Sequence, residues 1–186
     1  WDFVELPSQI MENWCYEKEC LDLFARHYQT DEALPAEWVE KLKESATFME
    51  GYATIRQLSF AKLDMAWHDG LPEHDTVAEQ EESVFADTAL FPPRPETNMS
   101  CSFSHIFQGG YSAGYYSYKW AEVLDADAFE LFKEKGLFDA DTALKFRALL
   151  ASGGSEHPAV IYKRFRGKDP DPEALLRRAG LIGTNG

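Results

Sequence analysis

The sequence predicts an all-α fold. Apolar residues recur every three or four positions along most of the chain, which is the spacing of one helix face. Residues that favour helix ends separate these segments, and no run alternates apolar and polar residues as a strand does. The chain has 186 residues, of which 45% are hydrophobic and 14% aromatic. That length and composition suit one domain, or a large piece of one, with a sizeable core.

Two long helical segments are expected in the N-terminal part of the chain. Residues 6–28 carry apolar side chains at near-helical spacing, and a polar break follows at residues 29–32. Pro35 stands where a helix favours its first residue, and the apolar pattern continues from there to Trp67. Gly51 lies within this second pattern, where it costs about 1 kcal/mol relative to alanine. We therefore expect a bend or close packing at Gly51.

Five further helices are expected in the remainder. Glycine, proline and aspartate mark their ends, and a proline-rich extended stretch at residues 91–95 and a loop at 96–110 lie between them. The expected helices cover residues 77–87, 112–135, 139 or 141 to 150, 160–165 and 171–180.

The charge balance excludes several classes of partner. The formal net charge is -14, which disfavours a nucleic acid and an anionic membrane surface. No apolar run is long enough to span a bilayer. Most carboxylates are expected to lie on solvated helix faces. Near the C-terminus, Arg164, Arg166 and Lys168 are interpreted as salt-bridge partners rather than as a site.

The three cysteines favour reduced thiols. Cys15, Cys20 and Cys101 are odd in number and lack the spacing of a disulfide framework, which predicts a cytoplasmic location. Cys15 and Cys20 also lack the common spacing of a zinc site. The chain starts directly in structured sequence without an initiator methionine or signal peptide, which suggests a fragment.

The most unusual stretch is H-I-F-Q-G-G-Y-S-A-G-Y-Y-S-Y, from His105 to Tyr118. Tyr111, Tyr115 and Tyr118 have the spacing i, i+4, i+7, which would place them on one helix face. The two glycines before them, at residues 109 and 110, leave a backbone that can offer N–H and C=O groups to an extended partner. Two interpretations stay open: interior helix packing, or a binding wall whose phenols donate to a developing oxyanion.

Three blocks of the sequence resemble the thimet oligopeptidase family of zinc metallopeptidases, which includes bacterial oligopeptidase A and the dipeptidyl carboxypeptidases. The run F-S-H-I-F-Q-G-G-Y-S-A-G-Y-Y-S-Y-K-W-A-E-V (103–123) resembles the family's glycine and tyrosine loop. The start, W-D-F-V-E-L-P-S-Q-I-M-E-N-W, is similar to the segment after its zinc helix. The family's C-terminus is matched by G-G-S-E-H-P, Y-K-R-F-R-G-K-D-P and L-L-R-R-A-G-L. The resemblance implies that residues 1–186 are the helical C-terminal part of a two-lobed, channel-forming catalytic domain that cuts short peptides.

The resemblance also implies roles for individual residues. Glu5 corresponds to the third zinc ligand, and the first two are histidines of an H-E-x-x-H helix whose glutamate is the general base. His105 corresponds to the loop histidine, Tyr111 and Tyr118 to the transition-state tyrosines, and Tyr115 to a residue beside the substrate. Gly109 and Gly110 would bind substrate backbone.

The sequence departs from the family pattern because no histidine in it begins an H-E-x-x-H motif. Since a catalytic zinc needs three protein ligands, we expect the isolated chain to be inactive and to need the missing N-terminal part of the enzyme. Residues 2–5 also have the spacing of a capping box, which is an alternative role for Glu5. Two alternative functions remain: a non-catalytic peptide-binding module or partner of a separate H-E-x-x-H chain, and a helical interaction protein with a degenerate site. The residues leave endopeptidase and dipeptidyl carboxypeptidase activity unresolved.

Overall fold

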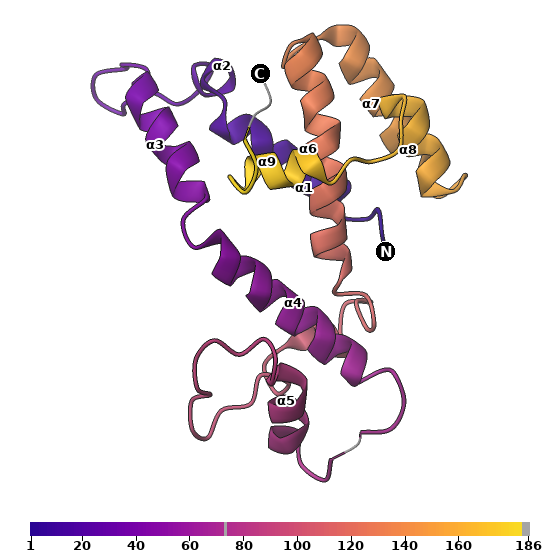
Figure 1. The fold of residues 1–186 in the computed structure, drawn as a ribbon. Helices are drawn as coiled ribbons and strands as arrows, with labels where there is room; N and C mark the ends of the chain where they lie inside the picture. Colours follow the sequence, from indigo (N-terminus) through magenta and orange to yellow (C-terminus); the bar gives the residue numbers. More distant parts are fainter. Residues whose placement is uncertain (73, 184–186) are drawn as a thin grey trace. The chain divides into compact units, whose positions relative to one another are not determined.

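The computed structural model describes residues 1–72 and 74–183, and this part of the chain is helical. Within it, the only β pairing is an isolated antiparallel bridge between Arg26 and Ala33, so the predicted all-α class is confirmed. No helix of the described residues is long and apolar enough to cross a membrane. The α-helices in Figure 1 are α1 (Leu6–Asn13), α2 (Lys18–Leu21), α3 (Ala36–Ala46), α4 (Glu50–Ala66), α5 (Val77–Phe85), α6 (Ser117–Lys135), α7 (Ala140–Ser152), α8 (Pro158–Arg166) and α9 (Glu173–Arg178). Two 3₁₀ turns are η1 (Trp14–Tyr16) and η2 (Ser104–Ile106).

The chain divides into two compact units. The first unit contains Trp1 and residues 49–119, and the second contains residues 2–48 and the chain from Trp120 onward. The stretch from His105 to Tyr118 therefore lies within the first unit, whereas Glu5 belongs to the second.

The core of the second unit is built from α1, α6, α7 and α8. Figure 1 shows α7 and α8 side by side, joined by a short turn that contains Gly153. The Trp14 ring meets Phe129 and Phe132 edge-on, with centroid distances of 4.7 and 4.8 Å. The buried members of this core are Leu6, Ile10, Leu124, Ala128, Phe129, Phe132, Phe146, Leu149, Tyr162 and Phe165.

Two buried aspartates on α6 tie the C-terminal segments of the second unit to this core. Asp125 is paired with Arg178 and accepts a hydrogen bond from Asn13 Nδ2 at 2.9 Å. Asp127 lies 3.4 Å from Arg166 Nε and 3.3 Å from Lys168 Nζ. Arg164 in turn pairs with Glu156 at 2.7 Å. These ion pairs confirm the predicted role of the three C-terminal cations.

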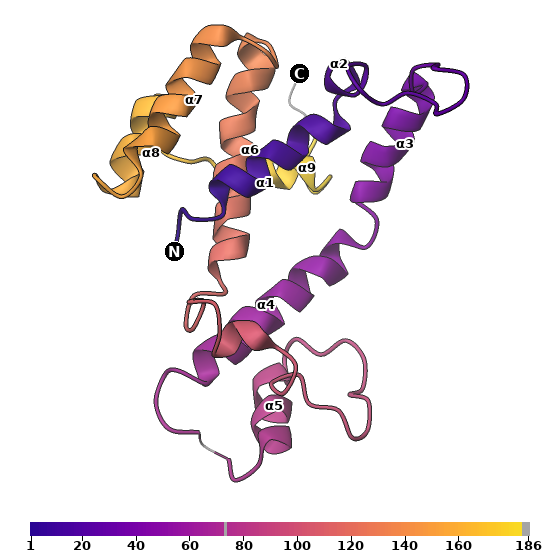
Figure 2. The same cartoon turned by 180° about the vertical axis from the view of Figure 1, so that it is seen from behind.

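The first unit packs α5 and the loop after it against α4 (Figure 2). Its α5 begins with a capping box between Thr76 and Glu79. The buried core residues are Phe60 and Leu63 of α4 together with Phe103, Ile106 and Tyr115 of the loop.

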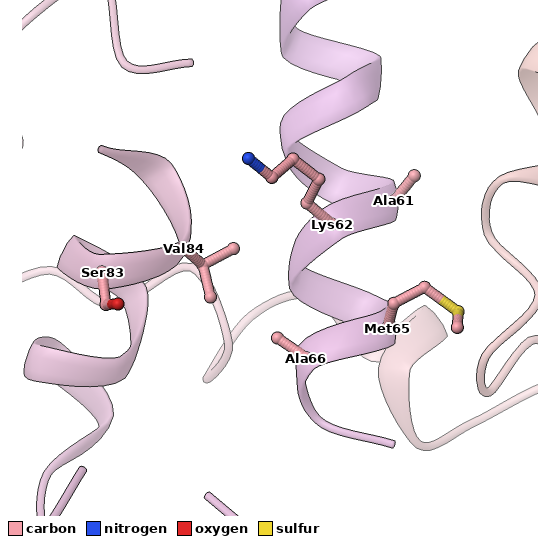
Figure 3. A pocket seen from close by; sticks show the side chains of 6 residues that line it. All are labelled: Ala61, Lys62, Met65, Ala66, Ser83 and Val84. Atoms are coloured by element: carbon pink, nitrogen blue, oxygen red, sulfur yellow. The ribbon is translucent and has the colours of Figure 1, made fainter. Parts of the chain in front are cut away.

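A groove of about 420 Å³ lies between α4 and α5 in the same unit. Figure 3 shows the side chains that line it: Ala61, Lys62, Met65, Ala66, Ser83 and Val84. Lys62 pairs with Asp87 at its edge. None of the candidate site residues lines this groove.

Two of the predicted helices are shorter than the apolar pattern suggested. The first ends at Asn13, and only η1 and α2 continue it, so that Phe24 and Tyr28 are exposed. The second is divided into α3 and α4, and Met49 at the break has a left-handed φ of 60°. The expected close packing at Gly51 is wrong, because its added Cβ meets open space, and the break in the helix falls two residues earlier, at Met49. The helices predicted for residues 77–87, 139–150, 160–165 and 171–180 are all present, with small shifts at their ends.

Candidate active site

The backbone of the tyrosine stretch is a series of turns that leads into α6. The helix begins at Ser117, so the prediction of a helix from residue 112 is wrong for its first five residues. Ala113 has a left-handed φ of 56°, which a continuous helix excludes. The turn is held instead by Asp64 of α4, whose carboxylate accepts the N–H groups of Ala113 at 3.1 Å and Tyr115 at 2.9 Å.

The turns nevertheless bring the three predicted tyrosines together around His105. The centroid of the His105 ring lies 5.2 Å from Tyr111, 5.2 Å from Tyr115 and 5.8 Å from Tyr118. Tyr111 and Tyr118 stack with centroids 5.5 Å apart and an interplanar angle of 14°. The Tyr118 hydroxyl is 3.3 Å from His105 Nε2. The cluster of His105, Tyr111, Tyr115 and Tyr118 is called the His–Tyr cluster below.

Burial differs among the tyrosines of the His–Tyr cluster. Tyr115 is buried and packs against Phe60 and Phe103 of the core, whereas Tyr111 and Tyr118 are partly exposed. Burial raises the pKa of Tyr115 above its usual value, and a hydrogen bond with Gln57 opposes this shift. Tyr115 therefore stays a neutral phenol in a fixed wall, and the two partly exposed tyrosines have surface accessible to a ligand.

The two glycines before the cluster have backbone conformations that other residues rarely adopt. Gly109 and Gly110 have φ values of 73° and 78°, in the left-handed region where a side chain is strained. Both are exposed. Within the described chain, no acceptor takes a hydrogen bond from either of their N–H groups. These donors are thus available to a ligand.

Trp1 covers one side of the same turn. Its ring stacks on Tyr111 with centroids 5.9 Å apart and an interplanar angle of 18°. A Cβ added to Gly114 would lie 2.4 Å from Trp1 Cδ1, so glycine is required for this contact. Sequence reasoning missed Trp1 as part of the site, because a stacking partner so far along the chain leaves no spacing signal.

Glu5 lies in the second unit, at the residue before α1. Glu5 is the N-cap residue of α1, and its side chain makes no capping hydrogen bond to the helix. Pro7 falls in the first turn of α1, where a missing N–H costs no helical hydrogen bond. The Ser8 hydroxyl donates to Glu5 Oε2 at 3.3 Å.

The donor set in this chain fits one zinc ligand rather than a whole zinc site. A carboxylate oxygen such as that of Glu5 is a common zinc ligand, but a catalytic zinc needs three protein ligands. Among residues 1–72 and 74–183, no three His, Cys, Asp or Glu side chains gather closely enough to hold a metal ion. Cys15, Cys20 and Cys101 are free thiols.

Sequence reasoning also missed two buried carboxylates that accept backbone N–H groups of loops in this unit. Asp64 stands four residues after Phe60 and next to Leu63, on the apolar side of its helix, and this misplaced charge was the available signal. Glu81 of α5 is buried as well and accepts the N–H groups of Met99 and Ser100.

Comparisons with known proteins agree with the resemblance read from the sequence. Residues 1–181 match the model of peptidase family M3. The probable cytosolic oligopeptidase A of Arabidopsis thaliana is 48% identical over 192 residues, which cover all of this chain and 27% of that protein. The organellar, chloroplastic/mitochondrial oligopeptidase A of the same plant is also 48% identical, over all of this chain and 24% of its own length. The dipeptidyl carboxypeptidase of Escherichia coli is 38% identical over 97% of this chain and 27% of that protein.

These matches cover nearly all of this chain but only part of each relative. The chain spans about a quarter of the length of the curated relatives it matches. Two of these relatives are named oligopeptidase A and one is named dipeptidyl carboxypeptidase. The two oligopeptidases, equally identical to this chain, are named for different compartments.

Proposed function

The chain belongs to peptidase family M3, and on this basis we propose that it is the transition-state and substrate-binding part of a zinc-dependent oligopeptidase acting on short peptides. The proposed reaction, hydrolysis of a peptide bond, needs residues beyond the 186 of this chain. The two histidine ligands and the general base are expected from another part of the complete protein. A cytoplasmic location is part of the proposal, and the name of one plant relative agrees with it.

The observation that carries the proposal is the His–Tyr cluster. Its rings are within 6 Å of His105, and two of its tyrosines are partly exposed beside an available glycine backbone. A cluster meant only for packing would be served by phenylalanine, whereas hydroxyl groups beside an exposed backbone suit a polar ligand. A peptide offers the matching groups, which are backbone carbonyls and N–H groups.

Each residue has a distinct role in this proposal. Tyr111 and Tyr118 donate hydrogen bonds to the oxyanion that forms when the scissile carbonyl is attacked. Each phenol O–H can donate a hydrogen bond to that oxyanion. His105 holds the substrate and orients the Tyr118 hydroxyl, which lies 3.3 Å from its Nε2. Tyr115 forms the wall beside the substrate, and Gly109 and Gly110 bind its backbone.

Glu5 supplies the metal ligand of this chain. A bound zinc ion would supply polarisation of the scissile carbonyl and a lowered pKa of the attacking water. Glu5 would hold the zinc ion together with the two histidines expected from another part of the protein, and its carboxylate would bring one negative charge to that site. Its position beside the rigid first turn of α1, which contains Pro7, limits the freedom of its backbone.

The test is Tyr118→Phe in the complete protein, assayed with a fluorogenic peptide. Removing one oxyanion donor should lower kcat by about 10²- to 10³-fold and change KM much less. Tyr52→Phe is the matched control, because Tyr52 lies in the same unit, packs on Phe91 and is outside the His–Tyr cluster. If Tyr118→Phe retains the kcat of the control, Tyr118 is not an oxyanion donor and the proposed function loses its main support.

A further inference from the structure

Asp64 is a buried carboxylate that no predicted role explains. Its exposed fraction is 0%, and it projects from α4 to the turn that carries the tyrosines. Its Oδ1 accepts the N–H of Ala113 at 3.1 Å and its Oδ2 accepts the N–H of Tyr115 at 2.9 Å. Both oxygens are thus engaged by one short stretch of backbone, 49 and 51 residues away in sequence.

The charge of Asp64 is balanced mainly by these backbone donors. Among the described residues, no lysine or arginine nitrogen lies within 4.0 Å of it, and His68 Nδ1 lies 3.3 Å from Oδ1. His68 Nδ1 is 2.7 Å from the Asp64 backbone carbonyl, so this nitrogen carries a proton and donates it to that oxygen. A buried carboxylate is costly without compensating donors, so the anion and the turn depend on each other.

The turn can offer two converging N–H groups because its backbone is not helical. Ala113 adopts a left-handed φ of 56°, and successive N–H groups in such a conformation point into one anion-binding concavity. A left-handed alanine is unfavourable by itself, and the carboxylate offsets that cost. The Ser112 hydroxyl also donates to the Ile106 carbonyl at 2.7 Å, but Asp64 is the group that accepts the N–H groups of Ala113 and Tyr115.

We propose that Asp64 is a positioning residue for the peptidase reaction. By accepting the N–H groups of Ala113 and Tyr115, it fixes the turn that brings Tyr111 and Tyr118 against His105. It does not contact substrate and acts through the two tyrosines. The inference rests on the proposed function, since the tyrosines it positions are the proposed oxyanion donors.

Asp64→Asn is the sharpest perturbation, because asparagine keeps the shape and one acceptor oxygen but replaces the other with an N–H₂ donor. One backbone N–H of the turn then faces a donor. Glu81→Gln is the matched control. Glu81 is also buried and also accepts two backbone N–H groups, but these belong to Met99 and Ser100, outside the tyrosine turn.

The variants are made in the complete protein and assayed by peptide hydrolysis and by amide hydrogen exchange. Asp64→Asn should lower kcat by about 10²-fold with little change in KM, because both oxyanion donors lose their place. In a Tyr111→Phe/Tyr118→Phe background, the same substitution should lower the residual kcat by less than about threefold, since its targets are already removed. Exchange should accelerate in the peptide covering residues 111–117 in Asp64→Asn, and in residues 97–103 in Glu81→Gln.

The proposal is overturned if Asp64→Asn lowers kcat equally in both backgrounds, or if Glu81→Gln reproduces its kinetic and exchange changes, because either result describes a general loss of stability. If Asp64→Asn fails to fold, amide exchange of the wild-type protein still tests the contact with Asp64. The amides of Ala113 and Tyr115 must be protected from exchange, and rapid exchange of both refutes the contact with Asp64. Failure of the proposed function is separate. It is indicated when Tyr118→Phe keeps full activity, whatever the exchange data show for Asp64.

Discussion

Replacing Gly114 with alanine tests the contact between Trp1 and the tyrosine turn. The added Cβ would lie 2.4 Å from Trp1 Cδ1, 3.0 Å from Trp1 Nε1 and 3.1 Å from the Tyr111 carbonyl oxygen. The first distance is shorter than any van der Waals contact, so an atom must move. The indole of Trp1 is 55% exposed and can swing outward, whereas the carbonyl oxygen belongs to the backbone of the turn. We therefore expect the Trp1 ring to leave its position on Tyr111.

The size of the effect follows from the contacts that are lost. An aromatic pair such as Trp1 and Tyr111, with centroids 5.9 Å apart, contributes about 0.5–1.5 kcal/mol beyond its area burial. The unfolding free energy of Gly114→Ala should fall by about 1–2 kcal/mol once the crowded carbonyl is included. Tyr111 stacks on Tyr118 in turn, so a displaced Tyr111 should also lower kcat, by about tenfold for each 1.4 kcal/mol of lost transition-state stabilisation.

Gly51→Ala is the matched control for this prediction. Gly51 is the second residue of α4 and has open space around the added Cβ, so alanine should stabilise the helix by at most about 1 kcal/mol and leave kcat unchanged. Denaturant unfolding and peptide hydrolysis of the two variants are compared with the wild type. If Gly114→Ala is as stable and as active as Gly51→Ala, Trp1 does not pack on the turn as described.

Two further predictions concern the second unit. Glu5→Gln should weaken zinc binding by at least about tenfold. The measurement is the metal content of the complete protein after dialysis against a chelator, with Glu12→Gln, at an exposed position, as the control. Equal metal content in the two variants would refute the ligand role of Glu5. Tyr162→Phe should lower the unfolding free energy at pH 7 by about 1–3 kcal/mol, because the Tyr162 hydroxyl donates to buried Asp127 Oδ2 at 2.7 Å. Burial, the hydrogen bond to Asp127 and its charge raise the pKa of Tyr162 above its usual value, so this stabilisation is complete below about pH 10 and declines at higher pH. The difference in unfolding free energy between wild type and Tyr162→Phe should therefore shrink above about pH 10, and a difference that grows there would contradict the hydrogen bond to Asp127. Tyr28→Phe, at an 86% exposed position, should change neither the unfolding free energy nor its pH dependence.

The helical class and most of the elements could be predicted because their signals are local. Apolar spacing and the residues that mark helix ends act over a few residues. Asp139, for example, accepts the N–H of Thr142 at the start of α7. The two long N-terminal helices were predicted wrongly for the opposite reason. Apolar periodicity persisted through residues 47–49, but nothing local indicated that Met49 would adopt a left-handed conformation there. Spacing alone could not reveal that break.

The tyrosine stretch shows how a correct grouping can follow from a wrong backbone. The spacing i, i+4, i+7 predicted that Tyr111, Tyr115 and Tyr118 would share a face, and their rings do gather at His105. They do so through a turn that ends before α6, and the carboxylate that holds this turn belongs to α4. If residues 112–116 were helical, Asp64 would be buried without its two backbone donors. This arrangement is unfavourable because a buried charge without hydrogen-bond partners is costly. The long-range contact therefore outweighs the local helical preference of residues 112–116. A charge such as Asp64 on the apolar face of a predicted helix is the sequence signal by which such a contact can be anticipated.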